Sequence, residues 1–223
     1  MVDIFDEVDE DLRAERMGRF ARRYGAVLIA LVVLLVVAVA GWQVWLWHRG
    51  QQNARAADAF IAALDHAGAR GSAASRAAIA AQFAAIAKTA PHGYATLSRL
   101  NEASLLANSG HAKQASALWE QLMSDGSISP VLRDVAILGW ASHALETAEP
   151  SLIQAKLETL AAAGNAWRPI ALQYLALLDI RTGDKAAAIK KFQSVADDVS
   201  TPTDMRNMAN AMAEALGAPP AGG

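Results

Sequence analysis

The stretch NEASLLANSGHAKQASALWEQLM, residues 101–123, has a counterpart later in the chain, LALLDIRTGDKAAAIKKFQSVAD at 175–197. Each stretch contains one glycine, Gly110 or Gly183, between two segments of helix-forming residues. A glycine at such a place supports a tight turn, because it adopts backbone conformations that other residues avoid. Both stretches are therefore predicted to be pairs of antiparallel helices.

Other positions also repeat around the two glycines. A small residue, Ala103 or Ala176, precedes the glycine by seven positions, and an alanine follows it by five. An aromatic residue, Trp119 or Phe192, comes four positions after that alanine. Small residues let paired helices approach closely, and the aromatic fills the space towards the next pair. Because the glycines lie about two repeats of roughly 34 residues apart, a middle unit is expected between them.

That middle unit is predicted, in degraded form, at 130–163. Trp140-Ala141 resembles the large and small pair of the first helix, and Glu149-Pro150 replaces the glycine turn. In the second helix, Ala155-x-x-x-Thr159 is assigned to the positions of the alanine and the aromatic, so the aromatic is missing. We therefore expect this unit to be the least regular of the array.

The chain after His48 reads as helix throughout, with Gly and Pro residues marking the breaks. No segment alternates polar and apolar residues in the manner of a strand. The predicted fold class is all-α, a solenoid of about three to four helical pairs with a closing helix. The expected helices are 51–67, 73–89, 93–109, 112–124, 130–146, 151–163, 167–182, 185–198 and 203–216. An alternative for the first of them is that it continues the preceding apolar helix as a stalk.

A long apolar segment precedes these pairs. From Gly25 to Trp47 the sequence is GAVLIALVVLLVVAVAGWQVWLW, and Gln43 is its only strongly polar side chain. As a helix this segment is about 34 Å long, against roughly 30 Å for the hydrocarbon core of a bilayer. A single transmembrane helix is the prediction. The alternatives are a buried core helix and a signal peptide that is cleaved after Ala40, at Ala38-Val39-Ala40.

Basic residues set the predicted topology, because they favour the cytoplasmic side of a membrane. They crowd the N-terminal flank of the apolar segment, at Arg13, Arg16, Arg19, Arg22 and Arg23. The N-terminus is therefore predicted to be cytoplasmic and the C-terminal domain to lie across the membrane. The predicted parts are a cytoplasmic amphipathic segment (1–24), the transmembrane helix (25–47), a stalk and first helical pair (48–90), the repeats with the closing helix (91–217) and a disordered tail (218–223).

Composition excludes several functions. Beyond the apolar segment, acidic and basic residues are equal in number, so no nucleic-acid-binding surface is expected. The chain has no cysteine, its five histidines lack metal-ligand spacing, and it contains no phosphate-binding loop or nucleophile elbow. Asp197-Asp198 is interpreted as a solvated helix end. No catalytic, cofactor or metal site is predicted, and the chain is not expected to be an enzyme.

Protein binding is the better hypothesis, since stacked helical pairs form a concave surface lined by the first helix of each pair. Placing Gly110 and Gly183 at the turn predicts a mostly apolar groove, which suits an apolar segment or a helix of another protein. If the closing helix fills this groove, the same residues are simply core. The predicted groove residues are Leu97, Leu100, Ser104, Ala107, Asn108, Val135, Leu138, Ser142, Leu145, Ile170, Gln173, Leu177, Ile180 and Arg181.

Two stretches, VDIFDEVDEDLRAERMGRFARRYG at 2–25 and NAWRPIALQYLALLDIRTGDKAAAIKKF at 165–192, carry a family resemblance. With the apolar helix between them, the chain resembles the YfgM-type ancillary subunits of the SecYEG translocon, in their α-proteobacterial branch. The resemblance implies a tetratricopeptide-repeat-like α-solenoid that is anchored in the bacterial inner membrane and exposed to the periplasm.

The same resemblance implies partners. They are the SecYEG translocon, a membrane-anchored periplasmic chaperone and client proteins with apolar segments. A different expectation is a structural scaffold of another envelope assembly, in cell division or cytochrome maturation, because such assemblies also anchor repeat domains by one helix.

Overall fold

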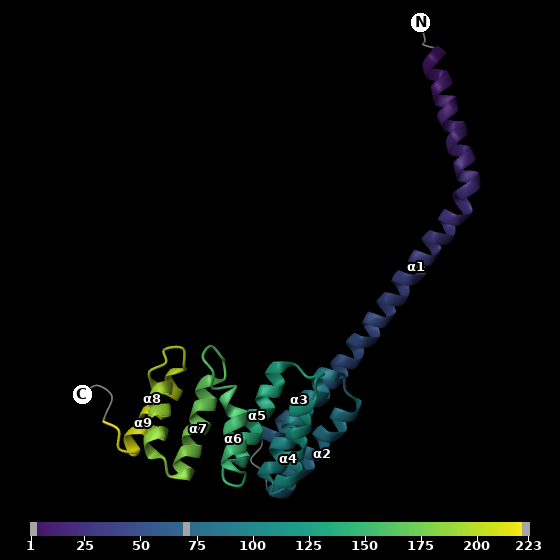
Figure 1. Ribbon diagram of the computed structural model, residues 1–223. Helices are drawn as coiled ribbons and strands as arrows, with labels where there is room; N and C mark the ends of the chain where they lie inside the picture. The colour runs from purple at the N-terminus through teal and green to yellow at the C-terminus, as the bar shows by residue number, and fades with distance from the viewer. Residues whose placement is uncertain (1–3, 69–71, 220–223) are drawn as a thin grey trace. The chain divides into compact units, whose positions relative to one another are not determined.

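The computed structural model describes residues 4–68 and 72–219, with side chains from Ala26 onward except that of Leu28. Within these ranges every regular element is an α-helix, which confirms the all-α prediction. The predicted amphipathic face of 1–24 and the disorder expected for the last residues of 218–223 fall outside what is described. The helices are α1 (Ile4–Gly68), α2 (Ala73–Thr89), α3 (His92–Asn108), α4 (Ala112–Ser124), α5 (Pro130–Ala144), α6 (Pro150–Glu158), α7 (Arg168–Thr182), α8 (Lys185–Ala196) and α9 (Thr203–Ala215) (Figure 1).

The chain divides into two units, Met1–Ala54 and Arg55–Gly223. The expected helix 51–67 is part of α1 and not a separate helix. Within α1, the segment Ile29–Gly68 contains an 18-residue window with a mean hydropathy of 2.5. By length and composition, this is the one helix of the described ranges that is able to cross a membrane. The second unit contains the helical array.

Helical pairs repeat along the second unit as the sequence predicts. The alanines before and after each glycine turn are fully buried, and Trp119 and Phe192 are 2% and 3% exposed. Each aromatic therefore fills the interior at the same place of its own pair. The pairs are α3 with α4, α5 with α6, and α7 with α8, and each helix from α2 onward packs against the next one along the chain (Figure 1).

The two glycine turns have the same geometry. Gly110 and Gly183 both have φ of 89°, a left-handed conformation that favours glycine. The amide of His111 donates to the carbonyl of Leu106 at 2.9 Å, and the amide of Asp184 donates to that of Asp179 at 2.8 Å. This is the Schellman pattern, in which the residue after the glycine closes the last turn of the helix.

In the middle repeat, the buried positions of the second helix differ from those predicted. Ala155 and Thr159, which were assigned to the alanine and aromatic positions of its second helix, are exposed. Ile153 and Leu157 are fully buried in their place, two positions earlier. The helix begins at Pro150 and ends at Glu158, after a turn that contains no glycine. Ile153 and Leu157 follow Ala141 by the same spacings at which Ala115 and Trp119 follow Ala103. The repeat is therefore intact, with Leu157 in place of the aromatic.

The closing helix α9 is the first helix of a further repeat. The turn after it contains Gly217, where φ is 102°, and the amide of Ala218 donates to the carbonyl of Ala213 at 3.0 Å. This Schellman turn follows the Gly183 turn by one repeat length. At the places of Leu172 and Ala176, which pack on the second helix of their own pair, α9 has Arg206 and Asn210. A polar face at this position is typical of the capping helix of a repeat array.

Trp119 also sets how closely two repeats approach. A Cβ atom added at Gly139, in the first helix of the next repeat, would lie 3.0 Å from Trp119 Nε1. Next to it, Trp140 Nε1 donates to Ser116 Oγ at 3.1 Å, and the ring of His143 stacks on that of Trp119. The absence of a side chain at Gly139 therefore lets α4 and α5 pack together.

Gly139→Leu is expected to destabilise the array. The added side chain meets the buried Trp119 ring, and overpacking of this kind costs about 1–3 kcal/mol of unfolding free energy. Gly93→Leu is the matched control, because Gly93 lies exposed in α3 with open space around it. Thermal unfolding in mild detergent measures both. Equal stability of the two variants would contradict this account of the contact.

Candidate protein-binding surface

The first helices of the three pairs lie in succession along the array. α3 contacts α5, and α5 contacts α7, in addition to the contacts that each makes with its second helix. Equivalent positions on these helices therefore form rows across neighbouring repeats, as expected for the inner face of a solenoid. All predicted groove residues lie on these three helices or directly after them.

The structure separates the predicted residues into three groups. Leu100 and Leu138 are buried, at 8% and 7% exposure, and both belong to the larger core cluster. Asn108 and Arg181 are exposed. The others are half-buried and form the candidate surface: Leu97, Ser104, Ala107, Val135, Ser142, Leu145, Ile170, Gln173, Leu177 and Ile180.

The half-buried residues are mostly apolar and have one side against the interior. Ala107, Val135, Leu145 and Ile170 pack against the cluster around Trp119, and Leu177 and Ile180 pack against the cluster around Phe192. Their other side is accessible to solvent. A partner that covers them gains free energy from apolar area removed from water, about 25 cal/mol per Å².

The polar members of this surface make local hydrogen bonds. Ser104 Oγ donates to the carbonyl of Leu100 at 3.1 Å, and Ser142 Oγ donates to that of Gly139 at 2.8 Å. These hydroxyls therefore need no partner from outside. Gln173 differs, because its Nε2 is buried and has no hydrogen-bond acceptor among the described residues.

The closing helix α9 packs against α8, and its buried residues Ala209 and Ala213 join the cluster around Phe192. Leu177 and Ile180, on α7, also pack against this cluster. The part of the surface on α3 and α5 lies against the other cluster, which contains no residue of α9.

Arg181 has a structural role that sequence reasoning missed. Its Nη1 donates to the carbonyls of Leu145 and Ala148, at 2.6 and 2.8 Å. Leu145 is the C-cap residue of α5, and Ala148 lies in the loop between α5 and α6, which has no glycine turn. Similarly, Arg76 Nε donates to the carbonyl of Asn108, at the end of α3. No local pattern signals these bonds, because donor and acceptor are more than 30 positions apart.

The neighbouring residues Asp197 and Asp198 have different roles. Asp198 accepts hydrogen bonds from the amide and hydroxyl of Ser200, and it forms an ion pair with Arg168 at 3.4 Å. The bond from the Ser200 hydroxyl is the main cause that lowers the pKa of Asp198. Asp125 accepts the same two bonds from Ser127 at the equivalent point after α4, two pairs earlier in the chain. These aspartates shape the loops into the next repeat.

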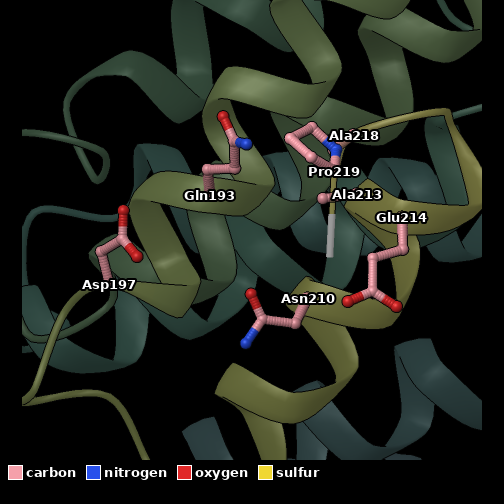
Figure 2. Close-up of a pocket in the computed structure, with 7 residues that line it drawn as sticks. All are labelled: Gln193, Asp197, Asn210, Ala213, Glu214, Ala218 and Pro219. Carbon is pink, nitrogen blue, oxygen red and sulfur yellow. The ribbon is translucent and has the colours of Figure 1, made fainter. Parts of the chain in front are cut away.

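Asp197 instead lines a small pocket at the C-terminal end of the array (Figure 2). The pocket lies between α8, α9 and the residues after α9, and its walls are mainly polar. Sequence reasoning gave no signal for it, since its residues come from separate helices. It is lined by Gln193, Asp197, Asn210, Ala213, Glu214, Ala218 and Pro219.

Metal-binding groups do not gather in the described part of the chain. Among residues 26–68 and 72–219, whose side chains the structure describes, no three His, Asp or Glu side chains lie together as a metal site would require. Glu102 and Asp134 have their pKa raised, in each case mainly by burial. What the surface offers is apolar area on a rigid helical support.

Arg181→Met tests the capping of α5. The substitution keeps an apolar stem but removes both hydrogen bonds, so the free energy of unfolding should fall by about 1–2 kcal/mol. Urea unfolding in mild detergent measures the loss. Arg99→Met, at an exposed position of α3, is the matched control and should stay within about 0.5 kcal/mol of the wild type. An equal loss in both variants would rule out the capping role.

Comparison with known proteins supports the assignment of a helical-repeat fold. The model of the tetratricopeptide repeat-like domain family matches residues 19–163. No curated protein and no solved structure matches the chain. The match extends over more than half of the sequence and includes the pairs α3 with α4 and α5 with α6. The chain belongs to the tetratricopeptide repeat-like domain family.

Proposed function

We propose that this protein is a membrane-anchored adaptor that binds other proteins through the inner face of its helical array. The observation that carries the proposal is the row of half-buried apolar residues across α3, α5 and α7. Tetratricopeptide-repeat-like domains generally act as protein-interaction scaffolds, and stacked first helices supply the surface for this. The adaptor has no catalytic role.

The anchor is the apolar part of α1. Its length and hydropathy suit a single span, and the arginines before it favour an N-terminus in the cytoplasm. In this proposal the protein resides in the bacterial inner membrane, and the helical array is in the periplasm. Confinement to the membrane raises the local concentration of a weak binding surface where exported chains emerge.

The partners in this proposal follow from the resemblance to YfgM-type proteins. They are the SecYEG translocon, a membrane-anchored periplasmic chaperone, and client proteins with apolar segments. The apolar character of the surface supports clients of this kind, because it has few charged groups that would select a charged peptide.

Ser104→Arg combined with Ser142→Arg is expected to block partner binding. The two serines lie at equivalent places of the surface, and each is half-buried with only a local hydrogen bond. Two bulky charged side chains would keep an apolar partner away, so its recovery in mild detergent should fall at least about tenfold. Ala117→Arg with Ala155→Arg, at exposed positions on the second helices α4 and α6, is the matched control.

The melting temperature of each double variant separates lost binding from unfolding. A folded serine variant that still recovers its partners would contradict binding at this surface. The identity of the recovered proteins separates the assemblies: translocon and chaperone subunits support the proposal, and components of cell division or cytochrome maturation support the scaffold alternative.

Membrane extraction tests the anchor. The full chain should stay with membranes in alkaline carbonate, because a spanning apolar helix is not released by charge or pH. The mature N-terminus should lie before Gly25. A mature chain that begins at Gly41 and is released by carbonate would mean that the apolar segment is a cleaved signal peptide.

A further inference from the structure

The side chains at the outer end of the apolar segment interact on one side of α1. The rings of Trp42 and Trp45 lie 5.1 Å apart, and the guanidinium of Arg49 lies 4.1 Å from the Trp45 ring centre. His48 and Gln52 are joined by a hydrogen bond of 3.1 Å. Successive residues of a helix turn by about 100°, which places all five on one half of its circumference. On this half of the helix, neighbouring side chains are therefore linked by a ring contact, a cation–π contact and a hydrogen bond.

Gln43 lies on the opposite half. Its carboxamide has no hydrogen-bond partner among the described residues. Trp47, one turn further along the helix, makes no ring contact with any described residue. Trp47 is 65% exposed. Spacings of four and three residues alternate along this side, through what we call the Gln43 seam: Val36, Ala40, Gln43, Trp47, Gly50 and Ala54.

Alternate spacing of this kind is the pattern of helices that pack in a left-handed pair. Ala40, Gly50 and Ala54 are small, so they let a second helix approach closely at the turns before and after Gln43 and Trp47. At Gly50 there is open space around the backbone. The seam therefore contains both small residues and the carboxamide of Gln43, which lacks a hydrogen-bond partner.

The carboxamide of Gln43 determines what kind of helix fits. In a membrane, an amide without a hydrogen bond is costly, and a neighbouring helix is the usual source of a partner. A glutamine side chain carries both a donor and an acceptor. Two parallel copies of this chain place their Gln43 residues at the same depth, where each amide can donate to the other.

We propose that the protein is a parallel dimer in the membrane, in which the Gln43 seams of two copies face each other. In such a dimer, each Gln43 carboxamide hydrogen-bonds to that of the second copy, and the small residues of one seam pack against those of the other. An isologous two-fold contact requires the same surface on both copies. The proposal rests on the anchor of the proposed function, since the seam matters only if α1 spans a membrane.

Cysteine crosslinking in native membranes tests the dimer. The full chain has no cysteine, so each single-cysteine variant reports one position. Gly50→Cys lies on the seam, and Gln52→Cys, on the opposite half, is the matched control. Under mild oxidation, Gly50→Cys should form a disulfide-linked dimer, and Gln52→Cys should form far less. Equal crosslinking of the two, or none, would overturn the proposal.

Gln43→Leu in the Gly50→Cys background tests the hydrogen bond. Loss of one interhelical polar contact should weaken dimer formation roughly three- to thirtyfold. Unchanged crosslinking, or a crosslinked product with the mass of a different protein, would overturn the reciprocal pairing. Carbonate extraction of every variant keeps the two proposals apart: release from the membrane counts against the anchor, whereas retention without a dimer counts against the seam alone.

Discussion

The array depends on one large buried side chain from each second helix. Trp119, Leu157 and Phe192 occupy equivalent places, and each joins the core shared by its own pair and the first helix that follows. Neither helix of a pair can bury its apolar face alone, so every repeat requires its neighbours. Trp119 illustrates the constraint best, because it fits only where the next repeat provides Gly139, a residue without a side chain. The sequence of one repeat is therefore restricted by the core residue of the repeat before it.

The same packing leaves the proposed binding surface accessible to solvent. The second helices bury the large residues between successive first helices, and this fixes the spacing of α3, α5 and α7. Leu100 and Leu138 fill the gaps between them, whereas positions one turn away retain a solvent-accessible side. The surface is thus a by-product of core formation, and a partner can use it without any rearrangement of the fold. Arg181 and Arg76 strengthen its edges, because they bind carbonyls at the ends of the neighbouring first helices.

Local periodicity was sufficient to predict the glycine turns and, to within two residues at each end, the helices other than α1 and α6. Gly110 and Gly183 allowed two pairs to be placed correctly, because a left-handed backbone conformation at a turn favours glycine. The middle repeat has no such glycine, so the predicted buried positions of its second helix were displaced by two residues, and Ile153 and Leu157 were missed. The roles of Arg181 and Asp198 and the polar pocket depend on contacts between distant residues, for which a single sequence carries no pattern. Burial of Leu100 and Leu138 was likewise beyond periodicity, because a first helix shows the same apolar stripe whether it faces a groove or a neighbour.

The polar face of α9 limits how such an array can change in evolution. A new pair added after α9 would have to pack on Arg206 and Asn210, where earlier first helices present Leu172 and Ala176 or their equivalents. Burying those groups without partners is costly, so lengthening at the C-terminal end is unfavourable. Duplication of an internal pair would instead join apolar faces, provided that the helix after Trp119 still has a glycine at the place of Gly139. The same barrier opposes end-to-end stacking of separate molecules through this face of α9.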